Sequence, residues 1–536
     1  MLPKLVFILA GLLSSITVVS QQRIPVEPRN VPEHEKNDLA ERLSNRSSEM
    51  GPSSSLIDPP KAADNNFVIN EQEDLDTGCT TRAGRPSGSL RIRLAVTRVV
   101  SKTQNQLSEA DVQRLTQNGV LGGAATLKLQ TYDVDTPGEV DEVFFNGVKL
   151  GKLTGRSGKW IPQHFQVPLH LVKFATYQSG GTPTPGENLI EVKIDTLMDG
   201  GWCTAVDWAA LSVKVMSPVV LIHGNGSNGE FFTRQGFATR LDALGVLTDK
   251  SIFLLPKYID ANAREIHRRL PGIAGSFGVD SVHVVTHSKG GLDFRGYLAA
   301  WHQTQSTFRV LSFTTLATPH NGSSLADILV NGSDYLKSND IILGAVLTYF
   351  GPYQDSHKDL VTARVTSFNH ANIPTLSRSY HANAQNKIIF NTVAADADKD
   401  GDKSLDASNP NELSELVDEA CLGSSFPSAC RPLNTLGAQA IYSLLLNTKS
   451  VKVTLSALGR PRIMYVPNIP PEDNDSLVGL SSAKGVNSFQ NLVTNSDTLA
   501  GNPGGRNHAS VADAEAANRV LQWLITADRG EFGDLR

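Results

Sequence analysis

Short stretches in which apolar and polar residues alternate dominate residues 78–216. Residues 89–96 (SLRIRLAV) show the pattern most clearly, because every second side chain is apolar, as in a half-buried β-strand. Similar runs occur at residues 125–130, 142–145, 189–194 and 210–215. Asn146-Gly147 is a typical turn signal between two of these strands. Many short strands within about 140 residues predict a β-sandwich over residues 78–216.

From residue 217 onward, short apolar strands alternate with helices. Residues 219–222 (VVLI) and 282–285 (VHVV) are apolar runs of the kind found in parallel sheets. Helical stretches are predicted at residues 260–270 and 291–301. Strands that alternate with helices indicate an α/β domain, which we place at residues 217–536.

Residues 1–20 have the features of a secretory signal peptide. Lys4 precedes an almost wholly apolar run at residues 5–19, and small residues stand at the −3 and −1 positions before residue 21. A buried strand and an uncleaved anchor are the alternatives, although a spanning helix usually needs about 20 apolar residues. We therefore expect a secreted protein, extracellular or periplasmic. Residues 21–77 are polar and lack a sustained apolar period, which predicts a mostly flexible leader.

Composition excludes several classes of function. The chain has 536 residues with 49 basic and 54 acidic side chains, so its net charge of −5 gives no electrostatic reason to expect nucleic acid as a partner. Hydrophobic residues at 40% and charged residues at 19% fit a globular protein with sizeable cores rather than a disordered chain.

Four cysteines in an exported protein suggest two disulfides, and the sequence alone allows three pairings. We favour Cys79–Cys203 and Cys421–Cys430, because each bond then closes within one predicted domain. The spacing includes no CxxC pair, so paired catalytic thiols and a zinc site are not expected.

Ser288 is the strongest candidate for a catalytic residue. It follows the predicted strand at 282–285 and precedes the helix at 291–301, within the sequence THSKGG. Such a nucleophile elbow projects a serine hydroxyl from a tight turn, and the helix N-terminus favours developing negative charge. The usual pattern is Gly-x-Ser-x-Gly, and Thr286 replaces its first glycine. The alternative is an ordinary strand-to-helix turn.

A second loop supplies candidate oxyanion donors. The strand at 219–222 ends in His223-Gly224-Asn225, and in an α/β-hydrolase the loop at this place provides one backbone donor. The residue after the nucleophile provides the other. We therefore predict that the backbone N–H groups of Asn225 and Lys289 form the oxyanion hole.

A serine nucleophile needs a general base, and the base needs an acid that orients it. Asp475 follows a strand-like run at residues 462–466, and His508 precedes a helix predicted at residues 512–527. Asp396, which follows the strand-like run at 387–393, is a rival acid. We prefer Asp475 because Asp396 also fits a metal-binding role.

Four short motifs occur in the order 286–291 (THSKGG), 315–323 (TLATPHNGS), 474–478 (NDSLV) and 507–508 (NH). Together they resemble those of secreted bacterial triacylglycerol lipases and related fungal lipases of the α/β-hydrolase superfamily, over roughly residues 218–530. The resemblance implies an α/β-hydrolase domain in which Ser288, Asp475 and His508 form the catalytic triad. Ser476 stands where glycine is common, and the chain after His508 lacks the acidic residue that helps the family's calcium site.

Residues 140–151 and 186–190 resemble segments of galactose-binding-like jelly-roll modules. This resemblance covers only the predicted β-sandwich. It implies an accessory domain that binds a carbohydrate or another surface ligand.

An acidic loop is a separate candidate for binding a metal ion. Its four carboxylates alternate along a chain that bends at Gly401, namely Asp396, Asp398, Asp400 and Asp402. This is the first half of an EF-hand-like pattern and predicts a structural calcium site. Ala407 replaces the usual bidentate glutamate, and a solvated acidic loop is the alternative. No cofactor is expected for catalysis.

Three further histidines are expected to have supporting roles. We expect the side chain of His287 to point away from Ser288, His283 to be structural, and His320 to lie behind the catalytic residues. An apolar run at residues 341–350 predicts either a lid over the site or a core helix.

These features predict a secreted serine hydrolase that cleaves carboxylic esters, a lipase or esterase, whose partner is an ester or lipid substrate. Two alternatives remain open. One is hydrolysis of another acyl bond, in a polyester, thioester or amide, because a fold does not define a substrate. The other is a binding protein on an inactive hydrolase fold. The oligomeric state is not predicted.

Overall fold

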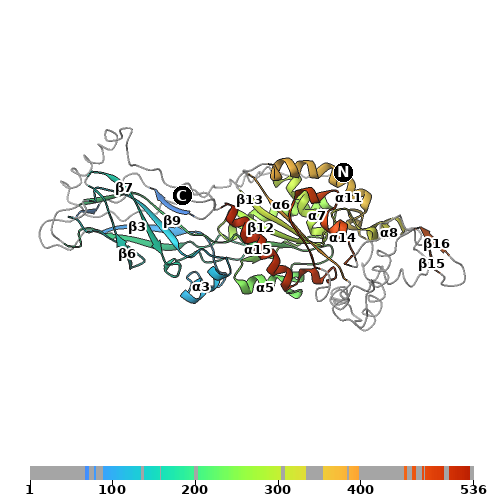
Figure 1. Ribbon diagram of the computed structural model, residues 1–536, viewed down its shortest axis with the longest axis horizontal. Helices are drawn as coiled ribbons and strands as arrows, with labels where there is room; N and C mark the ends of the chain where they lie inside the picture. The colour runs from blue at the N-terminus through green and yellow to red at the C-terminus, as the bar shows by residue number, and fades with distance from the viewer. Residues whose placement is uncertain are drawn as a thin grey trace, which may run out of the picture.

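The described part of the chain forms two lobes, one made mainly of antiparallel strands and one in which helices surround a parallel sheet (Figure 1). The structure is a computed structural model. It describes residues 67–71, 78–79, 89–134, 138–156, 158–197, 203–302, 308–332, 354–382, 386–397, 452–455, 462–465, 474–475, 477–499 and 506–531.

The β lobe contains two antiparallel sheets. The first has the strand order β1 (Phe67–Glu71), β9 (Cys203–Ser212), β4 (Ala125–Tyr132) and β7 (Trp160–Val167), with β2 (Gly78–Cys79) also paired to β9. The second has the order β3 (Ser89–Val96), β8 (Gly186–Lys193), β5 (Glu142–Phe145) and β6 (Val148–Lys152). Buried side chains alternate along β3, and they share one hydrophobic cluster with those of the other sheet.

Two details of this lobe bear on the sequence predictions, one on a turn and one on where the sheet begins. Asn146 and Gly147 join β5 to β6 with φ of 47° and 84°, which are the positive values that a tight hairpin turn needs. β1 lies within the segment predicted as leader and pairs with β9, so the sheet begins earlier than composition indicated.

The register of β2 and β9 places Cys79 directly opposite Cys203. Opposite residues of an antiparallel pair have Cα atoms about 4.5–5.5 Å apart, which is within the range that a disulfide spans. The bond itself stays a prediction. Cys421 and Cys430 lie outside the described residues.

The α/β lobe is built on a six-stranded sheet in which all neighbouring strands are parallel. The strand order is β11 (Thr248–Asp249), β10 (Val219–Ile222), β12 (Ser281–His287), β13 (Arg309–Leu316), β14 (Ile389–Ala395) and β17 (Val493–Leu499). This parallel sheet fits the predicted α/β-hydrolase domain.

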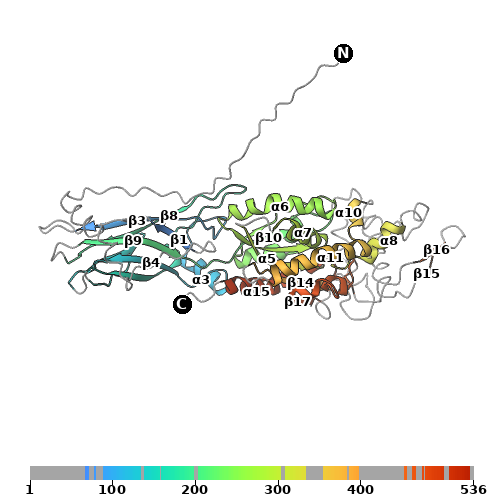
Figure 2. The same cartoon turned by 90° about the horizontal axis from the view of Figure 1, so that it is seen from above.

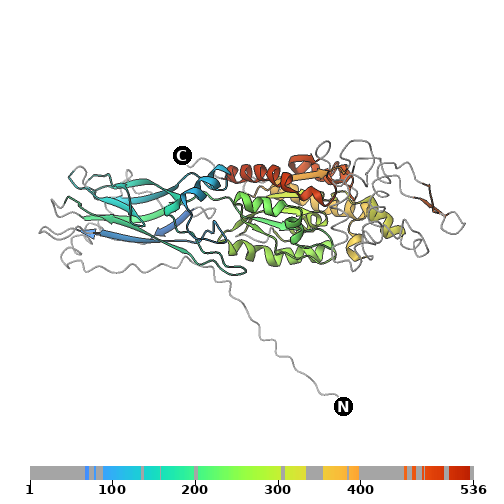
Figure 3. The ribbon, with the colours of Figure 1, turned by 90° about the horizontal axis from the view of Figure 1, so that it is seen from below.

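Both faces of the parallel sheet are covered, so its central strands are apolar on both sides. In β10, Val219 and Leu221 belong to one hydrophobic cluster, and Val220 and Ile222 belong to another. On the first face lie α5 (Phe237–Leu244) and α15 (Ala514–Glu531), and on the second lie α6 (Ile259–Ser276), α7 (Lys289–Ala300) and α11 (Thr362–Leu376). Figures 2 and 3 show α6 and α15 on opposite sides of the sheet.

Sequence periodicity misses two elements. The edge strand β17 contains five consecutive polar residues, which is possible because only one side of it pairs with the sheet. Helix α3 (Glu109–Gln117) interrupts the predicted strands, and its N-cap Ser108 accepts a hydrogen bond from the N–H of Asp111.

Several predicted features lie outside the described residues, including the signal peptide, the apolar run at 341–350 and most of the acidic loop. The predicted strand at 462–466 corresponds to β16 (Arg462–Tyr465), which pairs with β15 (Lys452–Leu455) rather than with the parallel sheet. Within the described ranges, no helix is both long and apolar enough to cross a membrane.

Candidate active site

Ser288 occupies a strained turn between β12 and α7. Its φ of 52° and ψ of −132° lie in a region that residues other than glycine rarely adopt. The N–H of Ser288 donates to the carbonyl of Leu316 in the neighbouring strand over 2.9 Å, which holds the turn in place. The turn therefore presents the hydroxyl at the carboxyl edge of the parallel sheet.

Small residues around Ser288 allow its turn to pack closely. A Cβ atom on Gly290 would lie 2.4 Å from the carbonyl oxygen of His223, and one on Gly291 would lie 2.2 Å from Oγ1 of Thr318. Thr286 fits in place of the usual glycine, because its side chain is fully buried in β12 and its hydroxyl donates to the Thr314 carbonyl over 3.4 Å.

His508 lies between Ser288 and Asp475. Its Nε2 atom is 2.9 Å from the Ser288 hydroxyl oxygen, and its Nδ1 atom is 2.8 Å from Oδ2 of Asp475. These distances place the imidazole where it can accept a proton from the serine while the carboxylate holds its other nitrogen. The structure thus brings together three residues that lie up to 220 positions apart in the chain.

Asp475 is fully buried, and backbone N–H groups as well as His508 form hydrogen bonds with its carboxylate. Its Oδ1 atom accepts hydrogen bonds from the N–H groups of Leu477 (2.9 Å) and Val478 (2.7 Å), which leaves Oδ2 for His508. The N–H of His508 also donates to the Asp475 carbonyl over 2.9 Å. The carboxylate and the imidazole are therefore oriented by backbone as well as by each other.

His287 contacts the backbone of His508, a partner that local sequence does not reveal. Its Nε2–H donates to the carbonyl oxygen of His508 over 2.7 Å, and Phe231 stacks on its ring at a centroid distance of 4.3 Å. Burial, together with the nearby His508, lowers the pKa of His287 well below its usual value, so the ring stays neutral. The ring is hydrogen-bonded to the backbone of His508 and not to the Ser288 hydroxyl, in line with the expected orientation, whereas its partner is revealed only by the tertiary contact.

The His223 loop lies against the nucleophile turn. A Cβ atom on Gly224 would lie 2.7 Å from Cβ of Ser288, so only glycine permits this approach. Nδ1 of His223 donates to the Gly224 carbonyl over 2.8 Å, and its Nε2 accepts from the N–H of Leu254 over 3.1 Å. Burial lowers the pKa of His223, which favours the neutral ring that this pattern requires.

The two predicted oxyanion donors lie on these adjoining segments. Neither the N–H of Asn225 nor that of Lys289 donates to any acceptor in the described part of the chain. The side-chain oxygens of Asn225 and Ser227 are also buried without a hydrogen-bond partner there. The two backbone N–H groups are therefore available to donate to the oxygen of a substrate carbonyl.

The other two candidate histidines are buried in the α/β lobe. His283 contacts Ser312 (2.8 Å) and Asp528 (2.9 Å), as expected of a structural residue. His320 contacts Thr315 through Nε2 and Arg295 through Nδ1, and Phe489 stacks on its ring. Burial and the adjacent guanidinium keep the pKa of His320 well below its usual value.

The acidic loop is described only at its start. The backbone of Asp396 is held by β17 and by Arg506, through bonds of 3.2 Å and 2.8 Å, while the His508 ring is bonded to Asp475 instead. Asp398, Asp400 and Asp402 lie outside the described residues. No group of three or more metal-binding side chains occurs in the part of the chain that the structure covers, so the calcium site stays a prediction.

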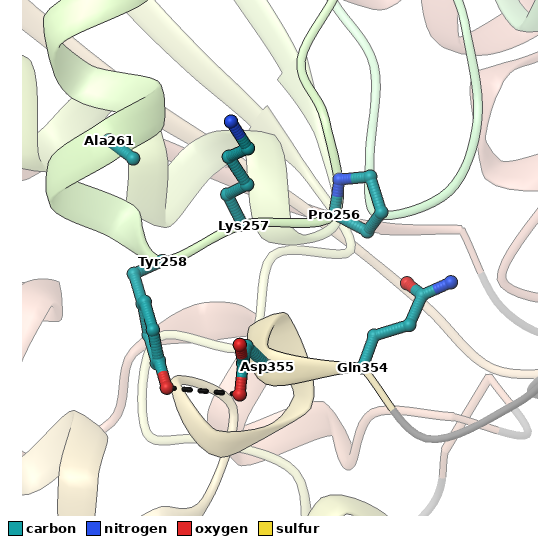
Figure 4. A pocket seen from close by; sticks show the side chains of 6 residues that line it. All are labelled: Pro256, Lys257, Tyr258, Ala261, Gln354 and Asp355. Carbon is teal, nitrogen blue, oxygen red and sulfur yellow. Dashed lines mark hydrogen bonds between the residues drawn. The ribbon is translucent and has the colours of Figure 1, made fainter.

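An open cavity of about 550 Å³ lies at the N-terminus of α6. It is lined by Pro256, Lys257, Tyr258, Ala261, Gln354 and Asp355 (Figure 4). The Tyr258 hydroxyl donates to Asp355 over 3.1 Å across this cavity. Phe253, Leu255 and Tyr258 expose 56%, 46% and 38% of their surface, so the same loop offers apolar side chains to a ligand.

The chain is similar to several solved lipases and esterases at low sequence identity. No family model and no curated protein matches the sequence. The mature Bacillus licheniformis lipase BlEst2 is 20% identical, and the match covers 58% of this chain and 92% of that one with a TM-score of 0.35. A Listeria innocua gene product is 11% identical, with coverages of 58% and 93% and a TM-score of 0.30. A metagenomic carboxyl esterase is 13% identical, and the match covers 59% of this chain and 75% of that one with a TM-score of 0.29.

Proposed function

We propose that this protein is a secreted serine hydrolase that cleaves carboxylic esters, with Ser288 as nucleophile, His508 as general base and Asp475 as the orienting acid. The observation that carries the proposal is a pair of hydrogen bonds, between the Ser288 hydroxyl and Nε2 of His508 at 2.9 Å and between Nδ1 of His508 and Asp475 at 2.8 Å. This arrangement is the one that activates a hydroxyl for acyl transfer.

In the first half of the reaction, the Ser288 hydroxyl attacks the ester carbonyl as Nε2 of His508 takes its proton. Asp475 stabilises the resulting imidazolium through Nδ1–H. The carbonyl oxygen becomes an oxyanion that the N–H groups of Asn225 and Lys289 stabilise, and loss of one such donor typically costs about 2.7–4 kcal/mol. His508 then protonates the leaving alcohol, and an acyl-enzyme forms.

In the second half, water attacks the acyl-enzyme. His508 takes a proton from the water and returns one to Ser288, which releases the carboxylic acid. The exposed apolar residues Phe253, Leu255 and Tyr258 near the His223 loop favour esters with an apolar chain.

The test is hydrolysis of a p-nitrophenyl ester series from acetate to palmitate by the parent and by Ser288→Ala. We expect turnover by the parent and a loss of at least about 10⁴-fold in the variant. Turnover that persists in a folded Ser288→Ala variant would overturn the assignment.

A fluorophosphonate probe separates the remaining alternatives. Covalent labelling of Ser288 without ester turnover would point to another acyl bond, whereas neither labelling nor turnover would point to a binding protein. Export is tested separately, by sequencing the N-terminus of the protein recovered outside the cytoplasm, which we expect to begin at Gln21.

A further inference from the structure

Lys289 is an unusual residue to find directly behind a nucleophile, because its whole side chain is buried. Its side chain is 1% exposed, and its ammonium group lies 2.5 Å from Oδ1 of Asp293, whose side chain is 3% exposed. A buried charge pair is expensive to desolvate and is often no more stabilising than apolar residues of the same size. Stability alone therefore does not explain why a lysine occupies this position.

The position of Lys289 in the turn suggests another role. The next two residues, Gly290 and Gly291, carry no side chain, and the short distances given above show that none would fit there. Lys289 is therefore the only one of the first three residues after Ser288 whose side chain can anchor the turn. Its bond to Asp293 spans the first turn of α7, directly behind the N–H that is proposed to bind the oxyanion.

The ion pair is also connected to the second oxyanion donor. Oδ2 of Asp293 accepts from Nδ2 of Asn262 in α6 over 2.9 Å, and the same Nδ2 donates to the carbonyl of Leu255 over 3.1 Å. The N–H of the adjacent Leu254 donates to His223.

His223 is in turn bonded to the Gly224 carbonyl, next to Asn225. A set of hydrogen bonds, most of them buried, and one backbone loop thus join the two donor segments.

We propose that Lys289 is a positioning residue for the oxyanion hole. Its side chain fixes the position of its own N–H relative to the N–H of Asn225, and the connection runs through Asp293, Asn262 and the loop bonded to His223. The inference rests on the proposed serine hydrolase function and assigns a role that the triad and the two backbone donors do not include. Errors of about 1 Å in the position of a catalytic group cost up to about 100-fold in rate, so a defined anchor has a measurable effect.

The test compares Lys289→Met with a double variant, Lys289→Met/Asp293→Leu. Methionine keeps most of the length without the charge, and the double variant also removes the carboxylate that would otherwise remain buried without its partner. We expect kcat for ester hydrolysis to fall at least about tenfold in both, with KM within about twofold of the parent, because the lost contacts matter mainly in the transition state.

Two further measurements separate positioning from a general loss of structure. A boronic acid that forms a tetrahedral adduct with Ser288 should bind more weakly by about the factor by which kcat/KM falls. The matched control is Asp528→Asn, which removes another buried charged partner, 2.9 Å from His283. It should lower the melting temperature while leaving kcat and boronate affinity unchanged.

The proposal is overturned if either folded Lys289 variant keeps kcat and boronate affinity within about twofold of the parent, or if Asp528→Asn loses activity to the same extent. Failure of the proposed ester hydrolysis is recognised independently, from an inactive parent. In that case the rate of fluorophosphonate labelling of Ser288 replaces kcat, because phosphonylation also develops charge on an oxygen in this hole. An equal labelling rate in the parent and in Lys289→Met would then overturn the positioning role.

Discussion

Replacing Asp475 by asparagine tests the role of one atom, the carboxylate oxygen that faces His508. Oδ1 of Asp475 accepts two backbone N–H groups, from Leu477 and Val478, and Oδ2 faces Nδ1 of His508. Asparagine has nearly the same shape but only one oxygen. That oxygen must face the two N–H donors, because an NH₂ group there would oppose them, so Nδ2 of the new side chain points at His508.

The consequence is a change of tautomer. With a donor opposite Nδ1, His508 must leave that nitrogen unprotonated and carry its proton on Nε2, which then cannot accept the proton of Ser288. An orienting acid replaced in this way costs about 10⁴-fold in kcat, or about 5 kcal/mol of transition-state stabilisation, while the fold is retained. KM should change little, because the carboxylate does not touch the substrate.

The assay is hydrolysis of p-nitrophenyl butyrate at saturating concentration, with the melting temperature as a check on folding. Asp396→Asn is the matched control, since it makes the same change in the rival acid, and its kcat should stay within about twofold of the parent. The reasoning is refuted if folded Asp475→Asn keeps kcat within about tenfold of the parent, or if Asp396→Asn is the inactive variant.

Two further predictions concern buried histidines. His287→Leu leaves the His508 carbonyl unpaired, which should lower the free energy of unfolding by about 1–3 kcal/mol, and the displaced His508 should lower kcat about tenfold or more. Unchanged kcat in this variant would show that the His508 backbone needs no such support. Burial lowers the pKa of His302 from 6.5 to about 4, so between these values the unfolded chain binds the proton and the folded protein does not. The free energy of unfolding should therefore fall by about 3 kcal/mol between pH 6.5 and 4, relative to His302→Phe, and parallel pH curves from urea unfolding would contradict this.

Local sequence patterns were sufficient for the parts of the site that depend on neighbouring residues. A strand, a tight turn and a helix follow one another within 20 residues around Ser288, and each has its own periodicity or glycine signal. The His223-Gly224 loop is identified in the same way, because it directly follows the strand Val219–Ile222. Backbone geometry and side-chain alternation are local properties, so they can be recognised without knowing which segments meet.

Contacts between distant segments could not be inferred in this way. The edge strand β17 looks like a loop because its residues are polar, and only pairing with β14 makes it part of the sheet. Both Asp396 and Asp475 follow strand-like runs, and the choice between them depends on which carboxylate lies beside His508 in space.

The strand, turn and helix around Ser288 can be recognised from neighbouring residues, and they were enough to predict a serine hydrolase. How the candidate site is held together depends instead on contacts between distant segments. His287 reaches the carbonyl of His508 across 221 positions, and Asn262 reaches Asp293 from another helix, as a partner for the ion pair of Lys289. Such contacts arise because a buried polar group must find a partner wherever the folded chain places one, and sequence distance does not limit that choice.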